Sequence, residues 1–367
     1  MVGSSVKNEW PMQTVNVTKS FLPPIEEFNY YVSKIWKNGQ LTNQGPLLIE
    51  LEQKIKGYLE VSNFHFLTNG TIALQVALRS LGITEGEVIT TPFSYVATTS
   101  SILWERCTPV YVDINPSDFC IDVSKIEAAI TPKTKAIMAV HVFGNPCDVE
   151  AIDKIAKKHS LKVIYDGAHA FGVRYKGRSL LGFGDITMCS FHATKLFHTI
   201  EGGGLVVGDD QVSDTVEYVK KFGHYGDEHY MLGINAKASE FQAAMGLANL
   251  PYIEEIIAAR KKSSELYDAL LPDHLKTSLR SSDVVKNYAY YPIVFKSEND
   301  LLFAMEKLKK NDIYARRYFY PSLNKLPYID SVQECPVSED ITRRILCLPL
   351  YHDIEDEMVK KICGILA

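Results

Sequence analysis

The chain has 367 residues, of which 46% are hydrophobic and 23% are charged, and its formal net charge is −5. This composition is typical of a folded globular protein of about two domains, and it excludes disordered, collagen-like and coiled-coil chains. Because the charge balance is mildly acidic, the composition offers no basic surface for nucleic acid or for an anionic membrane.

No apolar run approaches the roughly 20 residues that cross a bilayer, and residues 1–10 lack the basic start and apolar stretch of a secretory signal. The seven cysteines are odd in number, and no two of them form a Cys-x-x-Cys pair. The pattern therefore indicates neither a disulfide framework nor a zinc site. We expect a reduced cytoplasmic protein without a bound metal.

Segments with helical and strand-like periodicity alternate between residues 48 and 208. Short buried strands separated by helices of about 10–15 residues predict crossover connections and a mainly parallel sheet flanked by helices. The predicted helices are 48–58, 71–81, 94–104 and 148–159, and the predicted strands are 64–67, 88–90, 109–112, 135–142 and 161–165.

Past residue 235 the pattern changes to a long helical stretch, 236–271, which we expect to bend at Pro251. The sequence therefore predicts an α/β protein with a large domain over residues 1–250, which includes the N-terminal segment, and a smaller C-terminal αβ domain over residues 251–367. The other elements predicted in the smaller domain are a tyrosine-rich strand over 288–294 and helices over 299–310 and 353–366.

The first candidate site is Thr68-Asn69-Gly70-Thr71, where a predicted strand meets a predicted helix. The start of a helix offers free backbone N–H groups and the positive end of the helix dipole, which together suit a phosphate. An ordinary helix cap by Asn69 or Thr71 explains the same residues equally well. The segment is not a Walker loop, because no Gly-Lys-Ser/Thr follows it.

Two further candidates also follow strands. Asp166 and His169 come after the strand 161–165, at the strand end where α/β proteins bind ligands, although a cap and a structural histidine are equally good explanations. Lys195 has small or apolar neighbours, and burial among them would lower its pKa and make its amine a nucleophile; a solvated surface lysine is the alternative. The glycines 202–204 are expected to allow a tight turn and close approach of a cofactor.

Other polar residues carry weaker signals. Ser239 and Glu240, where the long helical stretch begins, are explained by helix capping alone. Basic and aromatic residues in the C-terminal part are candidates for binding a nucleotide, with a solvated basic face as the alternative. The residues concerned are Arg316, Arg317 and Tyr320, and His141, His224 and Tyr225 are further candidates for lining a pocket.

A phosphate-binding turn, a buried acid at a strand end and a nucleophilic lysine are together what pyridoxal phosphate requires. The acid keeps the ring nitrogen protonated, so that the ring can accept electrons when a substrate loses a proton. The lysine holds the cofactor and then transfers protons. This combination is much more specific than any of its parts.

The order and spacing of these motifs resemble the DegT/DnrJ/EryC/StrS family of sugar-nucleotide aminotransferases. The likeness covers nearly the whole chain, from Phe21-Leu22-Pro23-Pro24 to Cys347-Leu348-Pro349-Leu350. The motifs between these ends are Leu41-Thr42-Asn43-Gln44-Gly45-Pro46, Asn69-Gly70-Thr71, Asp166-Gly167-Ala168-His169, Ser190-Phe191-His192-Ala193-Thr194-Lys195, Glu201-Gly202-Gly203 and Gly233-Ile234-Asn235-Ala236-Lys237-Ala238-Ser239-Glu240.

The resemblance implies a fold-type I aminotransferase that binds pyridoxal phosphate and acts as a homodimer with active sites shared between the subunits. Lys195 then corresponds to the family's Schiff-base lysine, and Asp166 to the carboxylate paired with the ring nitrogen. His169 matches the residue near the cofactor's phenolic oxygen, and Tyr95 the aromatic residue stacked on its ring. The remaining implied contacts are those of Thr71, the Ile72 amide and Ser190 with the phosphate, and that of Asn235 from the neighbouring subunit.

The chain departs from the family pattern at two places. Leu196-Phe197-His198 follows the lysine where Asn-Ile/Leu-Thr is frequent, and Ala236-Lys237 replaces a commoner aromatic-Arg pair. Both departures bear on the sugar pocket or on the dimer contacts. Neither removes a chemical group that the mechanism needs.

The Ser-Phe-His-x-x-Lys and Glu-Gly-Gly motifs resemble family members that act at C4 of the sugar, whereas C3 enzymes more often carry Phe-Tyr-Pro around the lysine. The resemblance thus implies transfer of an amino group from L-glutamate to C4 of a nucleotide-linked 4-keto-6-deoxy sugar. The best-matched reaction converts dTDP-4-dehydro-6-deoxy-D-glucose to dTDP-4-amino-4,6-dideoxy-D-glucose for O-antigen or other surface polysaccharide. The alternatives are a C3 aminotransferase, a GDP-perosamine synthase-like enzyme and a catalytically silent regulatory homologue.

Overall fold

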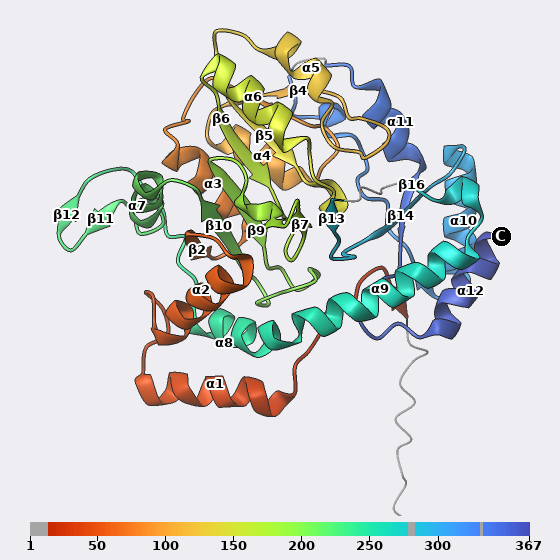
Figure 1. Ribbon diagram of the computed structural model, residues 1–367, viewed down its shortest axis with the longest axis horizontal. Coiled ribbons are helices and arrows are strands. Elements are labelled where there is room, and N and C mark those ends of the chain that lie inside the picture. Colours follow the sequence, from red (N-terminus) through yellow and green to blue (C-terminus); the bar gives the residue numbers. More distant parts are fainter. Residues whose placement is uncertain (1–13, 278–282, 331–332) are drawn as a thin grey trace, which may run out of the picture.

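The computed structural model describes residues 14–277, 283–330 and 333–367 (Figure 1). Its centre is a seven-stranded sheet in which every strand except β10 runs in the same direction, as the predicted mainly parallel sheet requires. In spatial order the strands are β2 (Asn63–Leu67), β10 (Gly203–Val207), β9 (Ile186–Ser190), β6 (Lys162–Asp166), β5 (Thr134–Val140), β3 (Glu87–Thr90) and β4 (Thr108–Tyr111).

Helices cover both faces of this sheet, because successive side chains of a buried strand point to opposite sides. In β6, for example, Ile164 belongs to one apolar cluster and Tyr165 to the other. The first cluster includes residues of α3 (Gly70–Ser80), α4 (Val96–Trp104) and α7 (Asp210–Val219). The second includes residues of α1 (Ile25–Asn38), α2 (Pro46–Leu59), α5 (Val123–Ile126), α6 (Val149–His159) and α8 (Glu240–Asn249).

The predicted helices and strands between residues 48 and 166 are all present, with small shifts at their ends. The prediction that the glycines form a tight turn is wrong for Gly203 and Gly204, because these two residues lie inside β10. A Cβ on Gly203 would lie 2.4 Å from the carbonyl carbon of Asn69, and one on Gly204 would lie 2.4 Å from Phe64 Cζ. The close approach that these glycines permit is therefore to the protein's own chain.

The predicted long helix is divided in two. Residues 236–239 precede the helix, because Ser239 is its N-cap and forms a reciprocal capping box with Gln242. Pro251 lies in a short 3₁₀ turn between α8 and α9 (Ile253–Leu270), where the missing proline N–H interrupts the helical hydrogen bonding. Figure 1 shows α9 continuing from α8 toward the C-terminal part of the chain.

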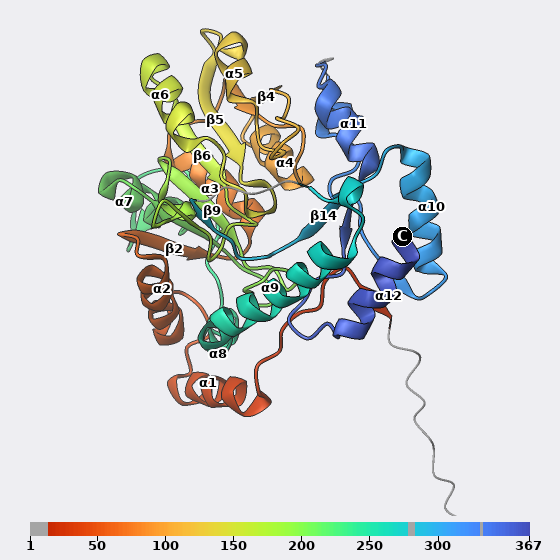
Figure 2. The same ribbon diagram turned by 45° about the vertical axis from the view of Figure 1, so that its right-hand side comes forward.

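The C-terminal part contains an antiparallel pair, β14 (Tyr291–Val294) and β16 (Ile345–Leu348), with helices beside it (Figure 2). At the other end of the chain, β1 (Val15–Asn16) pairs with β15 (Ile313–Tyr314), so the N-terminal segment also contacts this part. The division at residue 250 stays a prediction. The helices of this part are α10 (Glu298–Lys309), α11 (Pro336–Arg344) and α12 (Asp356–Leu366).

Among the helices of the described ranges, none combines the length and apolarity needed to cross a bilayer. Within those same ranges, no three His, Cys, Asp or Glu side chains gather as a set of metal ligands. All seven cysteines are buried and unbridged.

Candidate active site

A cavity of about 620 Å³ lies at the carboxyl ends of the parallel strands. Its walls come from the N-terminus of α3, the loops that follow β3, β6 and β9, and Tyr290, Arg316, Tyr318 and Phe319 of the C-terminal part. The crossover topology explains this convergence, since parallel strands end at one edge of the sheet and their loops meet there. Thr71, Ile72, Tyr95, Asp166, His169, Ser190 and Lys195 all line this cavity.

Asp166 ends β6 and is almost completely buried, with 5% of its surface exposed. One carboxylate oxygen accepts a hydrogen bond from Thr98 Oγ1 at 2.8 Å, and the other accepts one from the Ala168 amide at 3.1 Å. Burial raises the pKa of this carboxyl, while the two hydrogen bonds and the charge of Lys195 oppose the rise. A buried acid held in this way is suited to a cationic partner inside the cavity.

Lys195 lies five residues beyond the end of β9, and its Nζ is 3.4 Å from the hydroxyl of Tyr290. Burial lowers the pKa of the Lys195 amine, and the negative charge of Asp166 partly offsets this effect. A lowered pKa increases the fraction of neutral amine, which is the nucleophilic and proton-accepting form. The solvated surface lysine considered from the sequence does not describe this side chain.

His169 is buried against the ring of Tyr290, with the ring centroids 4.5 Å apart. Its Nδ1 accepts a hydrogen bond from the Phe143 amide at 3.1 Å, and burial lowers its pKa well below the ordinary value. The neutral ring therefore carries its proton on Nε2, which is the nitrogen left to donate. Such a donor suits an anionic oxygen in the cavity.

The N-terminus of α3 forms another part of the cavity wall. Asn69 is the cap of this helix, and its side chain accepts a hydrogen bond from the Ile72 amide at 2.9 Å. The capping role is therefore confirmed for Asn69, and Thr71 lies inside the helix. A Cβ on Gly70 would lie 3.2 Å from Ser190 Cβ, so glycine brings the helix terminus close to the serine hydroxyl.

Several residues singled out from the sequence lie elsewhere. His141 is fully buried and stacks on Tyr165 at 4.5 Å, so it does not line this cavity. Arg317 binds Glu298 at 2.7 Å, and its guanidinium lies over the ring of Tyr320. The remaining residues outside the cavity are Asn235, which is exposed, and His224 and Tyr225, which form the small hairpin strand β11.

The side chains at the departures from the family pattern contact neighbours within their own copy of the chain. Phe197 stacks on Phe171 with ring centroids 4.8 Å apart, and His198 Nε2 bonds to the Phe21 carbonyl at 2.6 Å. Lys237 lies over the ring of Phe222.

Sequence reasoning missed three side chains of the site: Tyr290 and Tyr318, which line the cavity, and Thr98, which bonds Asp166. Thr98 is one turn into α4, and only its bond to Asp166 distinguishes it from a core threonine. Tyr290 precedes β14 in the tyrosine-rich segment, and the composition of this segment does not show which of its tyrosines faces the cavity. Tyr318 meets Tyr290 edge-on at 5.5 Å, and burial raises its pKa to about 12.

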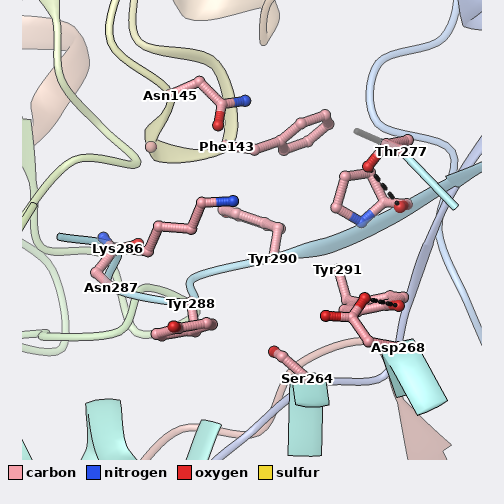
Figure 3. A pocket seen from close by; sticks show the side chains of 12 residues that line it. Phe143, Asn145, Ser264, Asp268, Thr277, Lys286, Asn287, Tyr288, Tyr290 and Tyr291 are labelled. Carbon is pink, nitrogen blue, oxygen red and sulfur yellow. Dashed lines mark hydrogen bonds between the residues drawn. The ribbon is translucent and has the colours of Figure 1, made fainter. Parts of the chain in front are cut away.

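Tyr290 also lines a smaller cavity of about 90 Å³ between the loop after β5 and the C-terminal part (Figure 3). Its polar walls include Lys286, Asn287 and the bonded pair of Asp268 and Tyr291. Asn287 is buried and donates to the carbonyl of His169 at 2.8 Å. The smaller cavity therefore shares Tyr290 with the main cavity, and its residue Asn287 bonds the backbone of His169.

The residues of the main cavity fit pyridoxal phosphate by their chemistry. The hydroxyls of Thr71 and Ser190 and the start of α3 suit its phosphate, while the buried acid Asp166 suits its protonated ring nitrogen. The amine of Lys195 suits its aldehyde. The Ile72 amide already bonds Asn69, so its expected phosphate contact would share that donor with the cap.

Comparison with known proteins agrees with this chemistry. Residues 24–367 match the DegT/DnrJ/EryC1/StrS aminotransferase family. The chain is 41% identical over 356 residues to dTDP-4-amino-4,6-dideoxy-D-glucose transaminase of Shigella dysenteriae, covering 94% of this chain and 96% of that protein. It is 33% identical to GDP-perosamine synthase of Escherichia coli O157:H7, covering 91% and 93%. A structure of DesI in the presence of its TDP-sugar product has a TM-score of 0.91 at 30% identity, covering 96% and 92%.

Proposed function

Because the chain belongs to the DegT/DnrJ/EryC1/StrS aminotransferase family, we propose that it transfers the amino group of L-glutamate to C4 of dTDP-4-dehydro-6-deoxy-D-glucose. The observation that carries the proposal is the convergence of Lys195 and Asp166 on one cavity beside the start of α3. The choice of sugar rests on similarity to the Shigella enzyme. The role in O-antigen synthesis and the cytoplasmic location stay predictions.

Each side chain has a role in this reaction. Pyridoxal phosphate, when bound, supplies an aldehyde and an electron-accepting ring. Asp166 holds a proton on the ring nitrogen, and the Nε2 donor of His169 is available to an anionic oxygen of the cofactor. The freed amine of Lys195 takes the proton from the α-carbon of glutamate and, in the second half-reaction, delivers a proton to C4 of the sugar.

The proposed active site is completed by a second copy of the chain. Asn235 lies outside its own cavity on an exposed segment that also presents apolar side chains, among them Leu232, which is 71% exposed, and Tyr225, which is 78% exposed. Exposed apolar groups of this kind mark protein interfaces. We therefore propose a homodimer in which Asn235 of each copy contributes to the cavity of the other. Light scattering of the purified protein tests the assembly.

Product identification tests the reaction. The protein loaded with pyridoxal phosphate is mixed with L-glutamate and dTDP-4-dehydro-6-deoxy-D-glucose, and the product is examined by mass spectrometry and NMR. The expected product carries the amino group at C4, and 2-oxoglutarate is formed in equal amount. Absence of any reaction with glutamate would contradict an aminotransferase.

A second candidate substrate is a GDP-linked 4-keto-6-deoxy sugar, which the 33% identity to GDP-perosamine synthase supports. Parallel reactions with dTDP-linked and GDP-linked 4-keto sugars, and with a 3-keto sugar nucleotide, separate these alternatives. Faster turnover of the GDP-linked sugar would favour the perosamine-type reaction. Amination of the 3-keto sugar would move the reaction to C3.

A further inference from the structure

Arg316 presents its guanidinium to the main cavity from the C-terminal part of the chain. Its backbone is held on both sides, since its amide donates to the Cys347 carbonyl at 3.1 Å and its carbonyl accepts from the Cys347 amide at 2.8 Å. The guanidinium lies 4.8 Å from the centroid of the Tyr318 ring, a stacking position that orients it. Cys347 therefore holds the backbone of Arg316 and Tyr318 orients its guanidinium, while the side chain stays exposed to solvent.

The neighbouring arginine, Arg317, has a guanidinium that is already bonded within the protein. Arg317 binds Glu298 at 2.7 Å and the carbonyl of Arg343 at 3.2 Å. Arg316, by contrast, forms no ion pair with a carboxylate of residues 14–277, 283–330 or 333–367. Its hydrogen-bonding fork is thus available to a ligand.

The charges around the cavity leave Arg316 a distinct role. Among the residues that the structure describes, the cavity is lined by one lysine and one arginine, Lys195 and Arg316, and by the carboxylates of Asp166 and Glu201. Lys195 is used by the reaction, and Glu201 lies 3.6 Å from His192. The start of α3 is suited to the cofactor phosphate. Of the described side chains of one copy that line the cavity, Arg316 is therefore the permanent cation that remains for an anionic substrate group.

Both proposed substrates carry such a group, a carboxylate in glutamate and a diphosphate in the sugar nucleotide. Guanidinium binds either oxyanion through two parallel hydrogen bonds. We propose that Arg316 binds and positions a substrate oxyanion in this cavity, an inference that rests on the proposed function. In a reaction with two half-reactions the substrates occupy the cavity in turn, so one guanidinium can serve either of them.

Binding of two unreactive probes tests the proposal. Glutarate presents carboxylates without an amino group, and dTDP presents a diphosphate without a sugar. Their affinities for the pyridoxal phosphate-loaded protein are measured by calorimetry for the unchanged chain and for Arg316→Gln and Arg316→Lys. We expect Arg316→Gln to weaken at least one probe by about 10–100-fold, because a charge-assisted hydrogen-bonded pair is lost. Arg316→Lys keeps the charge without the fork, so its affinity should be intermediate.

The pattern across the probes identifies the source of the oxyanion. If Arg316→Gln weakens the binding of glutarate alone, Arg316 is assigned to the amino donor. If it weakens the binding of dTDP alone, Arg316 is assigned to the nucleotide. Weaker binding of both probes assigns Arg316 to each substrate in turn. Equal affinity of Arg316→Gln and the unchanged protein for both probes would overturn the proposal, and so would failure of the unchanged protein to bind either probe.

Arg178→Gln is the matched control, because it removes an exposed guanidinium that lies over Phe183 and outside the cavity. Its probe affinities should equal those of the unchanged protein. Circular dichroism and the cofactor absorbance report whether the Arg316 variants are folded and loaded. Probe binding does not require turnover, so a protein that binds both probes through Arg316 and aminates no sugar contradicts the proposed function alone.

Discussion

The Nζ of Lys195 lies 3.4 Å from the hydroxyl of Tyr290, and this contact joins the loop after β9 to the segment that leads into β14. The ring of Tyr290 also packs against His169 at 4.5 Å. Lys195 and His169, which the sequence predicted to act on the cofactor, thus both contact Tyr290, which the sequence did not single out. The amine that would transfer protons is positioned by a residue almost a hundred positions away in the chain.

Replacement of Lys195 by alanine should abolish the reaction with glutamate. The amine is the proton carrier, and positioned proton transfer contributes about 10²–10⁴-fold, so turnover should fall by at least that factor. The measurement is the change in cofactor absorbance on adding glutamate, together with product formation. Lys261→Ala, which removes an exposed lysine outside the cavity, should react normally. Retained turnover in Lys195→Ala would contradict the assignment.

Replacement of Tyr290 by phenylalanine should slow the glutamate half-reaction by about 10-fold with little change in KM, because its hydroxyl contacts the Lys195 amine and we expect it to act by orienting that amine. Removal of this hydrogen bond should also shift the pH dependence of the rate. Single-turnover absorbance measurements across pH check both effects. Tyr288→Phe, which alters only the smaller cavity, is the control. An unchanged rate and pH profile in Tyr290→Phe would remove Tyr290 from the mechanism.

Replacement of Asp166 by asparagine should reduce turnover by at least about 10²-fold, because the ring nitrogen loses its anionic partner. Turnover is measured with glutamate and the preferred sugar nucleotide. Asp210→Ala, which removes an exposed carboxylate bonded to Asn63, is the control. Equal effects of the two substitutions would argue against a role for Asp166 at the ring nitrogen.

The same substitution should make the cofactor-free protein more stable at neutral pH. Burial raises the pKa of Asp166, so the folded state resists losing a proton that the unfolded chain releases near pH 4. The contribution of Asp166 to stability is therefore lost as pH rises from about 4 toward its raised pKa in the folded state, and Asp166→Asn lacks this loss. Thermal unfolding of both proteins should give a higher Tm for Asp166→Asn at pH 7 and a difference that shrinks toward pH 4. A constant difference would contradict this account.

Glu240 should be essential for stability and not for chemistry. Its carboxylate is 1% exposed and accepts hydrogen bonds from the amides of Leu47 and Leu48, both at 2.9 Å, at the start of α2. Glu240→Ala leaves these two donors unpaired in a buried place, which should cost about 2–4 kcal/mol of unfolding free energy. Urea unfolding measures the loss, and Glu265→Ala, at an exposed position, should cost little. An equal loss of unfolding free energy at both positions would contradict the role of Glu240 as the acceptor that caps α2.

Local pattern was sufficient for much of the fold. The alternation of helix-like and strand-like segments between residues 48 and 208 predicted a mainly parallel sheet, because the periodicity of burial is set by neighbouring residues. Gly203 and Gly204 were misread as a turn for the converse reason. Glycine ordinarily marks turns, and only the contacts of β10 with Asn69 and Phe64 explain why a strand requires it here.

By itself, the sequence determined the α/β class, and through its motifs the family and the candidates Lys195 and Asp166. Tertiary structure decided which side chains meet them, such as Thr98 and Tyr290. It also decided that Arg316 and not Arg317 faces the cavity, although the two are adjacent and chemically identical. The physical reason is that side-chain direction depends on the backbone path and on partners far away in the chain, here Cys347 for one arginine and Glu298 for the other.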